Sequence, residues 1–182
     1  YRPFINSCNA ALEKTENKYL PVWINSTGGD YEILTGMLDY LDEKKKDGIP
    51  VITCFGATYC KSGGVNVFSK GDCRYASPSS HWLLHTVSVA KPENKPEDYI
   101  TKIDNEFDDD YWFEMVEQRS HQIFKWLEQD LALPEGTIHS FINKYSEDRN
   151  ELYFDVELAK EINLFTHIGI PNEEQIMKDI ET

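Results

Sequence analysis

The sequence predicts an α/β fold with one layered core. Two short runs rich in Val and Ile, at 20–25 and 49–55, have the composition of buried strands. Between them lies an apolar stripe at helical spacing, formed by Ile33, Leu34, Met37, Leu38 and Leu41. A strand, a helix and a second strand in this order make a βαβ unit, which implies a parallel strand pair and a right-handed crossover.

The ends of this helix carry their own signals. Asp30 stands ahead of the stripe as the expected N-cap, and the segment 43–48, "EKKKDG", ends it with positive charge and a glycine. Further along, 65–78 predicts a short helix followed by a turn, and 81–85, "HWLLH", predicts another strand. The Pro- and charge-rich segment 91–100 is typical of an exposed loop.

The last part of the chain predicts three helices and a strand. A long helix is expected through Ile103, Phe107, Tyr111, Met115, Ile123, Phe124 and Leu127. After a break at 133–136, a shorter helix is expected through Ile138, Phe141, Ile142 and Tyr145. Asp155 is expected to cap a further helix that Asn163 ends, and 164–170 is expected to be the last strand.

Length and composition indicate one soluble domain spanning 1–182. The chain has 182 residues, of which 40% are hydrophobic. A net charge of −14 argues against a nucleic-acid partner, because phosphate contacts need clustered Lys and Arg. No apolar run approaches the ~20 residues of a membrane helix. The first residues show no signal-peptide pattern, so we expect a cytoplasmic protein with no membrane association.

The four cysteines are expected to be reduced. Cys8, Cys54, Cys60 and Cys73 form no CxxC pair, which argues against a zinc site, and a domain of this size needs no disulfide framework. We therefore expect neither a metal nor a cofactor. Cys60 is left available for chemistry, although a lone cysteine is more often a small buried hydrophobe.

Two glycine-containing turns are the candidate sites of chemistry. The segment 24–30, "INSTGGD", follows a strand and precedes a helix, so Gly28 and Gly29 can present backbone N–H groups to a phosphate or an oxyanion. The segment 56–64, "GATYCKSGG", has the same context and offers two nucleophiles, Cys60 and Ser62. His85, which ends a predicted strand, is a candidate base.

Three stretches of the sequence resemble the proteolytic subunit of the Clp protease, within the wider Clp–crotonase fold. The segment 22–41 is similar to the family's strand, "INSPGG" turn and helix, with Thr27 in place of the usual proline. The segment 54–85 is similar, without a gap, to the stretch from "GxAAS" to "MIH", and 151–165 resembles the segment that begins with the triad aspartate. The resemblance spans about Pro21 to Gly169. It implies repeated ββα-type units, a mostly parallel sheet and a helical handle.

The ungapped register implies specific roles. It places Cys60 at the nucleophilic serine, His85 at the catalytic histidine and Glu151 at the triad aspartate. It also places the backbone N–H groups of Gly29 and Lys61 at the oxyanion hole. Four more positions have counterparts: Arg74 and Pro78 in their motif, Asp155 at the helix-capping serine, and Asp148 as a replacement for Glu151 if the loop slips.

A second register stays open. The "SGG" at Ser62 resembles the signal peptide peptidase branch of the same fold, in which a serine is paired with a lysine; Lys61 or Lys70 would then be the base. The sequence favours Cys60 over Ser62 because the ungapped run also places Gly56, Pro78 and His85. Cys in place of Ser and Glu in place of Asp are both chemically viable.

The resemblance implies an ATP-dependent Clp-type endopeptidase subunit. It would assemble into a homo-oligomeric ring, cleave peptides or unfolded proteins, and work with an ATP-driven AAA+ unfoldase or a paralogous Clp subunit. The region 86–145 lacks the family's Gly-rich strand and is longer, so we expect a remodelled handle. Two alternatives are a non-catalytic interaction subunit with a degenerate triad and a crotonase-like enzyme acting on an acyl-CoA thioester.

Overall fold

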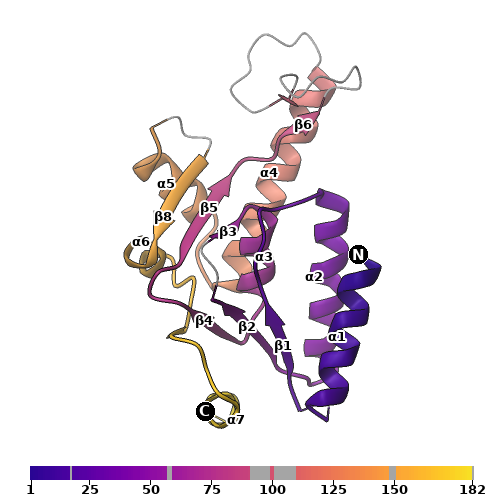
Figure 1. Ribbon diagram of the computed structural model, residues 1–182. Helices are drawn as coiled ribbons and strands as arrows, with labels where there is room; N and C mark the ends of the chain where they lie inside the picture. Colours follow the sequence, from indigo (N-terminus) through magenta and orange to yellow (C-terminus); the bar gives the residue numbers. More distant parts are fainter. Residues whose placement is uncertain (17, 57–58, 91–98, 101–109, 148–150, 182) are drawn as a thin grey trace. The chain divides into compact units, whose positions relative to one another are not determined.

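The structure is a computed structural model that describes residues 1–182 except 17, 57–58, 91–98, 101–109, 148–150 and 182 (Figure 1). Its elements in chain order are α1 (Arg2–Lys14), β1 (Leu20–Trp23), α2 (Tyr31–Lys46), β2 (Val51–Phe55), β3 (Tyr59–Lys61), α3 (Gly63–Ser69), β4 (Cys73–Ala76), β5 (His81–His85), β6 (Val89–Ala90), β7 (Tyr99–Ile100), α4 (Asp110–Asp130), α5 (Thr137–Tyr145), β8 (Glu151–Asp155), α6 (Val156–Glu161), β9 (His167–Ile168) and α7 (Glu173–Ile180). The predicted α/β class is confirmed.

The chain divides into two compact units. The first comprises Tyr1–Leu83 and Phe154–Thr182, and the second comprises Leu84–Tyr153. The expected handle region, 86–145, falls within the second unit. Along the described residues, no helix is both long enough and apolar enough to cross a membrane.

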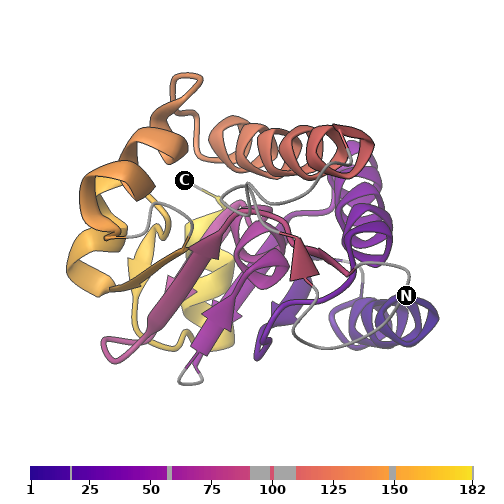
Figure 2. The ribbon, with the colours of Figure 1, turned by 90° about the horizontal axis from the view of Figure 1, so that it is seen from above.

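The main sheet of the first unit is parallel, with the strand order β1-β2-β4-β9. The predicted βαβ unit is confirmed: β1 and β2 pair in parallel on either side of α2, and the Asp30 carboxylate accepts the N–H of Ile33 at 3.0 Å. Figure 2 shows α1, at the label N, beside α2. In Figure 1, α2 and α7 lie on opposite sides of the strands β1, β2 and β4.

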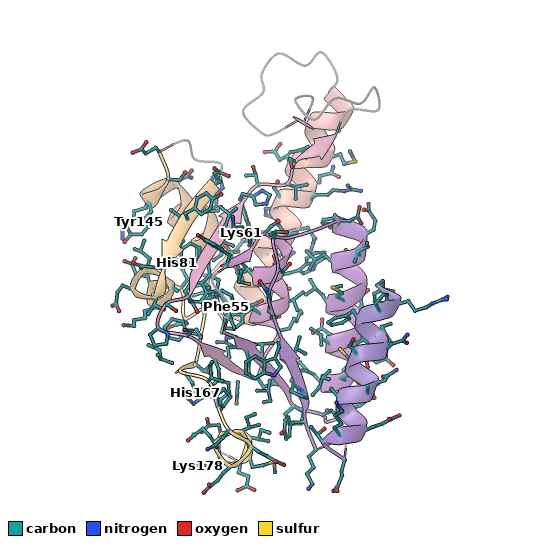
Figure 3. All side chains as sticks on the ribbon, viewed as in Figure 1. Phe55, Lys61, His81, Tyr145, His167 and Lys178 are labelled. Carbon is teal, nitrogen blue, oxygen red and sulfur yellow. The ribbon has the colours of Figure 1, made fainter. Side chains whose placement is uncertain are left out.

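Both faces of β2 are buried, which explains why four of its five residues are apolar. On one face Ile52 and Cys54 pack with Ile176 of α7. On the other, the Thr53 hydroxyl donates to the carbonyl of Phe68 in α3 at 2.7 Å, and the Phe55 ring meets the Phe68 ring edge-on (Figure 3 labels Phe55). β2 is therefore covered by α7 on one face and by α3 on the other.

A smaller sheet, β3-β5-β8, carries the second glycine turn. β3 pairs with β5 in parallel, with Cys60 opposite Trp82 and Lys61 opposite Leu83. Trp82 is fully buried, and its ring stacks on the rings of Phe154 and Phe165. The predicted strand 81–85 is confirmed as β5.

The second unit is described mainly by α4 and α5. The buried Glu128 of α4 accepts the N–H groups of Gly136 and Ile138, so one carboxylate holds the start of α5. The predicted break at 133–136 and the shorter helix after it are confirmed. Ile103 and Phe107, predicted to begin the long helix, lie outside the described residues, as does Asp148.

Several sequence predictions were wrong. The segment 65–78 was predicted to be a short helix followed by a turn, but its residues 73–76 form β4; Tyr99–Ile100, predicted to be loop, pair with β6 in antiparallel orientation. The last strand is only two residues long. The helices α1 and α7 were not predicted.

The predicted capping roles in α6 are confirmed: Asp155 accepts the N–H groups of Glu157 and Leu158, and Asn163 takes the left-handed conformation after the helix (φ 51°).

Candidate active site

The turn between β1 and α2 is shaped by Ser26 and Gly28. Gly28 has φ +101°, a conformation that favours glycine, and its N–H donates to the Ser26 hydroxyl at 3.1 Å. Gly29 follows with open space on its side-chain side. Asp30 then begins α2, so Gly29 is placed between a fixed turn and a capped helix.

Ser62 occupies the junction between β3 and α3 in a strained conformation. Its φ is +53° and its ψ is −130°, which is uncommon for a residue other than glycine. Its own N–H donates to the carbonyl of Leu83 at 2.8 Å, and its carbonyl accepts the N–H of Val65 at 2.9 Å. Backbone hydrogen bonds on both sides therefore hold the residue in this conformation.

The Ser62 side chain lies against the first glycine turn. A Cβ placed on Gly28 would come within 2.6 Å of the Ser62 Cβ and 3.0 Å of its Oγ. The two turns singled out from the sequence, 24–30 and 56–64, therefore meet in the first unit. Gly28 is required both by its positive φ and by this close approach.

Cys60 is buried in the core. Its exposure is 0%, and a Cβ on Gly64 would lie 3.4 Å from its Sγ. Burial raises the pKa of this thiol well above its ordinary value. A thiolate is the reactive form of cysteine, so this environment disfavours nucleophilic chemistry.

The lysines considered at this site have other partners. The backbone N–H of Lys61 donates to the carbonyl of Ser26 at 3.0 Å, and its ammonium lies 4.8 Å from the centre of the Tyr59 ring. Lys70 is nearly buried, and its ammonium contacts both carboxylate oxygens of Asp42 at 2.9 Å. The predicted oxyanion donor Lys61 thus has its N–H committed within the turn.

Sequence reasoning did not select Gly63 as a donor. Gly63 and Gly64 begin α3, where backbone N–H groups lack partners inside the helix. The signal that could have found Gly63 is its position directly after Ser62, because the residue after a nucleophile commonly supplies an oxyanion N–H.

A cavity of about 270 Å³ adjoins these glycines. Gly28, Gly29, Gly63 and Gly64 are among its lining residues, with apolar side chains from α1, β1, α2 and α3 and the polar residues Asn25, Ser26 and Asp30. The site therefore combines a serine, backbone N–H groups and an apolar pocket. Among the described residues, no cluster of three or more His, Cys, Asp or Glu is arranged to hold a metal ion.

The remaining predicted catalytic residues belong to the second unit. The Nδ1 atom of His85 is hydrogen-bonded to the carbonyl of Thr86. A carbonyl can only accept, so Nδ1 carries the proton and Nε2 is the acceptor in the neutral ring. Glu151 is exposed at the start of β8, and its carbonyl accepts the Ser146 hydroxyl.

Arg74 has a structural position in the first unit. Its guanidinium donates to the carbonyls of Gly71, Asn163 and Leu164, which ties β4 to the segment before β9. Pro78 follows the end of β4 by two residues. Within β5, successive side chains point to opposite faces, so Trp82 and Leu84 share one face while Leu83 and His85 share the other.

The fold is similar to that of several solved peptidases. A peptidase from Plasmodium falciparum has a TM-score of 0.64 at 15% identity, over 93% of this chain and 88% of its own. ClpP1 from Listeria monocytogenes has a TM-score of 0.61 at 16% identity, over 90% and 81%. The 1510-N membrane-bound stomatin-specific protease has a TM-score of 0.68 at 12% identity, over 98% and 76%.

That last protease was solved as a serine-to-alanine mutant and, with a substrate peptide, as a lysine-to-alanine mutant. An enoyl-CoA hydratase from Shewanella pealeana matches at a TM-score of 0.50 and 11% identity, over 96% of this chain and 58% of its own. No family model and no curated protein sequence matches the chain. The structure therefore has the fold shared by the ClpP-like peptidases and the crotonase enzymes.

Proposed function

We propose that this protein is a serine peptidase in which Ser62 attacks the scissile carbonyl. The observation that carries the proposal is the contact between Ser62, held at φ +53°, and the Gly28–Gly29 turn. Strained conformations of this kind are retained where a side chain must be aimed. The similarity to peptidase folds supports the same reaction class.

The backbone N–H groups of Gly29 and Gly63 are the proposed oxyanion donors. They flank Ser62 on its two turns, and both residues border the cavity. Attack by the Ser62 Oγ forms a bond to the carbonyl carbon and moves negative charge onto the carbonyl oxygen. Backbone donors already fixed in place stabilise that charge without reorganising.

His85 is the proposed base. Because its Nδ1–H donates a hydrogen bond to the Thr86 carbonyl, Nε2 is the atom proposed to accept the hydroxyl proton of Ser62 and to return it to the leaving amine. In the second half of the reaction, His85 Nε2 takes a proton from a water molecule, whose oxygen attacks the acyl carbon. The bond to the Ser62 Oγ then breaks and the proton returns to that oxygen, which frees the new carboxyl group. Glu151 has a smaller proposed role than a triad carboxylate usually has, because Nδ1 already has an acceptor.

The burial of Cys60 favours Ser62 as the nucleophile. Cys60 is fully buried, and burial raises the pKa of its thiol. A lysine base for Ser62 is disfavoured in the case of Lys70, because its ammonium is bound by the Asp42 carboxylate.

By the same resemblance we propose that the protein assembles into a homo-oligomeric ring and hydrolyses peptides or unfolded proteins. An AAA+ unfoldase or a paralogous Clp subunit is the proposed partner. A peptidase that depends on such a partner would still hydrolyse short peptides by itself, since these need no unfolding. An assay with short peptides therefore tests the hydrolytic chemistry without requiring the unfoldase partner.

The test is labelling by a fluorophosphonate probe, read by peptide mass spectrometry, together with hydrolysis of a fluorogenic peptide. We expect the adduct on Ser62, activity reduced at least about 1000-fold in Ser62→Ala and His85→Ala, and activity within about threefold of wild type in Cys60→Ala. Ser79→Ala, an exposed serine in the β4–β5 loop, is the matched control.

An adduct on Cys60, or activity that survives Ser62→Ala, would overturn the assignment. A wild type that takes no probe and cleaves no peptide would favour the interaction subunit. If an acyl-CoA raised the Tm of such an inactive protein, the crotonase-like interpretation would replace both the peptidase and the interaction subunit.

A further inference from the structure

A second cavity, of about 570 Å³, is lined entirely by residues of the second unit. Four of its lining residues are buried and six are exposed, so it is open to solvent on one side. The buried ones are Thr86, Ser120, Phe124 and Glu128, and the exposed ones are Glu117, Gln118, His121, Glu135, Gly136 and His139. Its volume is in the usual range of ligand sites.

The charge of this cavity favours a cation. Its described lining residues include three glutamates and no Lys or Arg. One of them, Glu128, accepts the N–H groups of Gly136 at 3.1 Å and Ile138 at 2.8 Å, so the start of α5, which would otherwise attract an anion, already has a carboxylate. The carboxylates of Glu117 and Glu135 add negative charge on the exposed side.

Hydrogen bonds fix the walls of the cavity to one another. Glu128 belongs to α4, and its two bonds reach the start of α5. One further bond joins α4 to the segment after β5: the Ser120 hydroxyl accepts the N–H of Val87 at 2.8 Å. The cavity is therefore preformed, and a ligand would not have to order its walls.

Thr86 supplies a buried hydroxyl that the described part of the protein does not use. Thr86 is only 5% exposed, and its carbonyl accepts the Nδ1–H of His85. Its hydroxyl makes no hydrogen bond to any described residue. Buried polar groups are nearly always hydrogen-bonded, so this hydroxyl at the cavity indicates a polar partner that enters from outside.

We propose that this cavity binds an organic cation, a guanidinium or ammonium group carried on an aliphatic chain. Its N–H groups would donate to the Thr86 hydroxyl and to the Glu117 and Glu135 carboxylates, since all three accept hydrogen bonds. The aliphatic chain would contact the Phe124 ring. The cation is either a free amine or the side chain of a Lys or Arg in a peptide, which present the same group. This inference does not depend on the proposed peptidase activity.

The test is calorimetric titration with three compounds. Agmatine and N-acetyl-arginine methylamide carry the guanidinium without and with peptide groups, and N-acetyl-citrulline methylamide has a similar shape without the charge. The His121 Nε2 lies 3.9 Å from the Glu135 carboxylate, so the titration is done at pH 8, where an ordinary imidazole is neutral and does not compete. We expect wild type to bind a guanidinium compound with a Kd below about 1 mM, and the citrulline compound at least about tenfold more weakly.

Two cavity variants and a matched control locate the binding. Glu135→Gln and Thr86→Val are each expected to weaken binding at least about fivefold, through a lost charge and a lost hydrogen bond. Glu114→Gln removes the same charge from an exposed position on α4 that does not line the cavity, and it is expected to change the Kd less than twofold. Circular dichroism checks that each variant is folded.

The outcomes separate a site from general attraction to an acidic chain. Equal weakening in Glu135→Gln and Glu114→Gln, or equal affinity for the arginine and citrulline compounds, would overturn the proposal. A folded wild type that binds neither guanidinium compound would also overturn it and would leave the Thr86 hydroxyl to an ordered water. Binding of agmatine alone would support the proposal with a free amine as the ligand, and binding of the arginine compound alone would support it with a peptide side chain.

Discussion

At the level of single residues, the conformation of Ser62 depends on what lies opposite it. Ser62 is held at positive φ by backbone bonds to Leu83 and Val65, yet its side chain would have no room if Gly28 carried a Cβ. Two turns that are separate in the sequence thus constrain each other. The proposed nucleophile is positioned by the residue that faces it as much as by its own turn.

Gly28→Ala is expected to lower peptide hydrolysis at least about 100-fold, because displacing a reacting atom by about 1 Å has costs of this order. The added Cβ would lie 2.6 Å from the Ser62 Cβ, so one turn must move. Gly48→Ala is the matched control: Gly48 also has positive φ (79°) but has open space around its side-chain position. It is expected to lose stability while keeping kcat/KM. Equal loss of activity in both variants would mean that general destabilisation explains the effect.

Glu151→Gln is expected to lower kcat by less than about tenfold, whereas His85→Ala abolishes hydrolysis. The reason is that the Thr86 carbonyl already fixes the Nδ1 proton of His85. Steady-state kinetics of the two variants checks this. A loss near 10⁴-fold in Glu151→Gln, as expected for removal of a true triad carboxylate, would show that Glu151 orients the imidazole during the reaction.

At the level of elements, α7 is joined to the sheet by one carboxylate as well as by apolar packing. Asp179 accepts the Tyr75 hydroxyl of β4 and the Gln175 amide, and it lies 3.3 Å from the Nε2 of His167. These contacts, the Tyr75 hydrogen bond foremost, lower the pKa of Asp179 below its ordinary value of 3.8. The pKa of Tyr75 is raised, by burial first and by Asp179 second.

Asp179→Asn is expected to lower the Tm at pH 7 by a few degrees. A carboxyl whose pKa is lower in the folded state contributes stability above its unfolded pKa, and this is lost as the pH falls through the folded value. The Tm difference from wild type should therefore shrink once the pH drops below 3.8. Thermal unfolding by circular dichroism between pH 2 and pH 7 measures it, with Asp39→Asn on the exposed face of α2 as control. A difference that is constant with pH would assign the effect to packing.

The elements that the sequence predicts are those with local signals. Asp30 and the apolar stripe after it define α2 without any neighbour, and Asp155 and Asn163 define α6 in the same way. α7 also has local signals, with Asn172 accepting the N–H of Gln175 at its start, Glu173 and Glu174 in its first turn and Lys178 in its last, so it could have been predicted from the sequence. Short strands such as β4 and β9 owe their conformation to pairing partners distant in the sequence.

The candidate site was predictable in part for the same reason. Both glycine turns could be found from the sequence, because each has a strand before it and a helix after it. The choice between Cys60 and Ser62 could not be made there. It depends on where β3 ends: Cys60 lies inside the strand and faces the core, whereas Ser62 lies just beyond it. A three-residue strand gives no periodicity from which to read that boundary.

At the scale of the whole molecule, the net charge of −14 acts on any assembly of identical chains. Subunits with this charge repel one another, and salt screens the repulsion with a Debye length of about 10 Å at 0.1 M. If the proposed ring forms through mainly apolar contacts, its stability should therefore rise with ionic strength.

We expect the oligomeric fraction at a fixed protein concentration to increase between 50 mM and 500 mM NaCl. Size-exclusion chromatography with light scattering measures the mass, and sodium sulfate at matched ionic strength controls for effects specific to chloride. Peptide hydrolysis measured in the same samples shows whether activity follows assembly or belongs to the single chain. Dissociation at high salt would instead mean that oppositely charged pairs hold the subunits together, which would require the 18 Lys and Arg residues to be concentrated at the interface of a chain carrying 32 Asp and Glu.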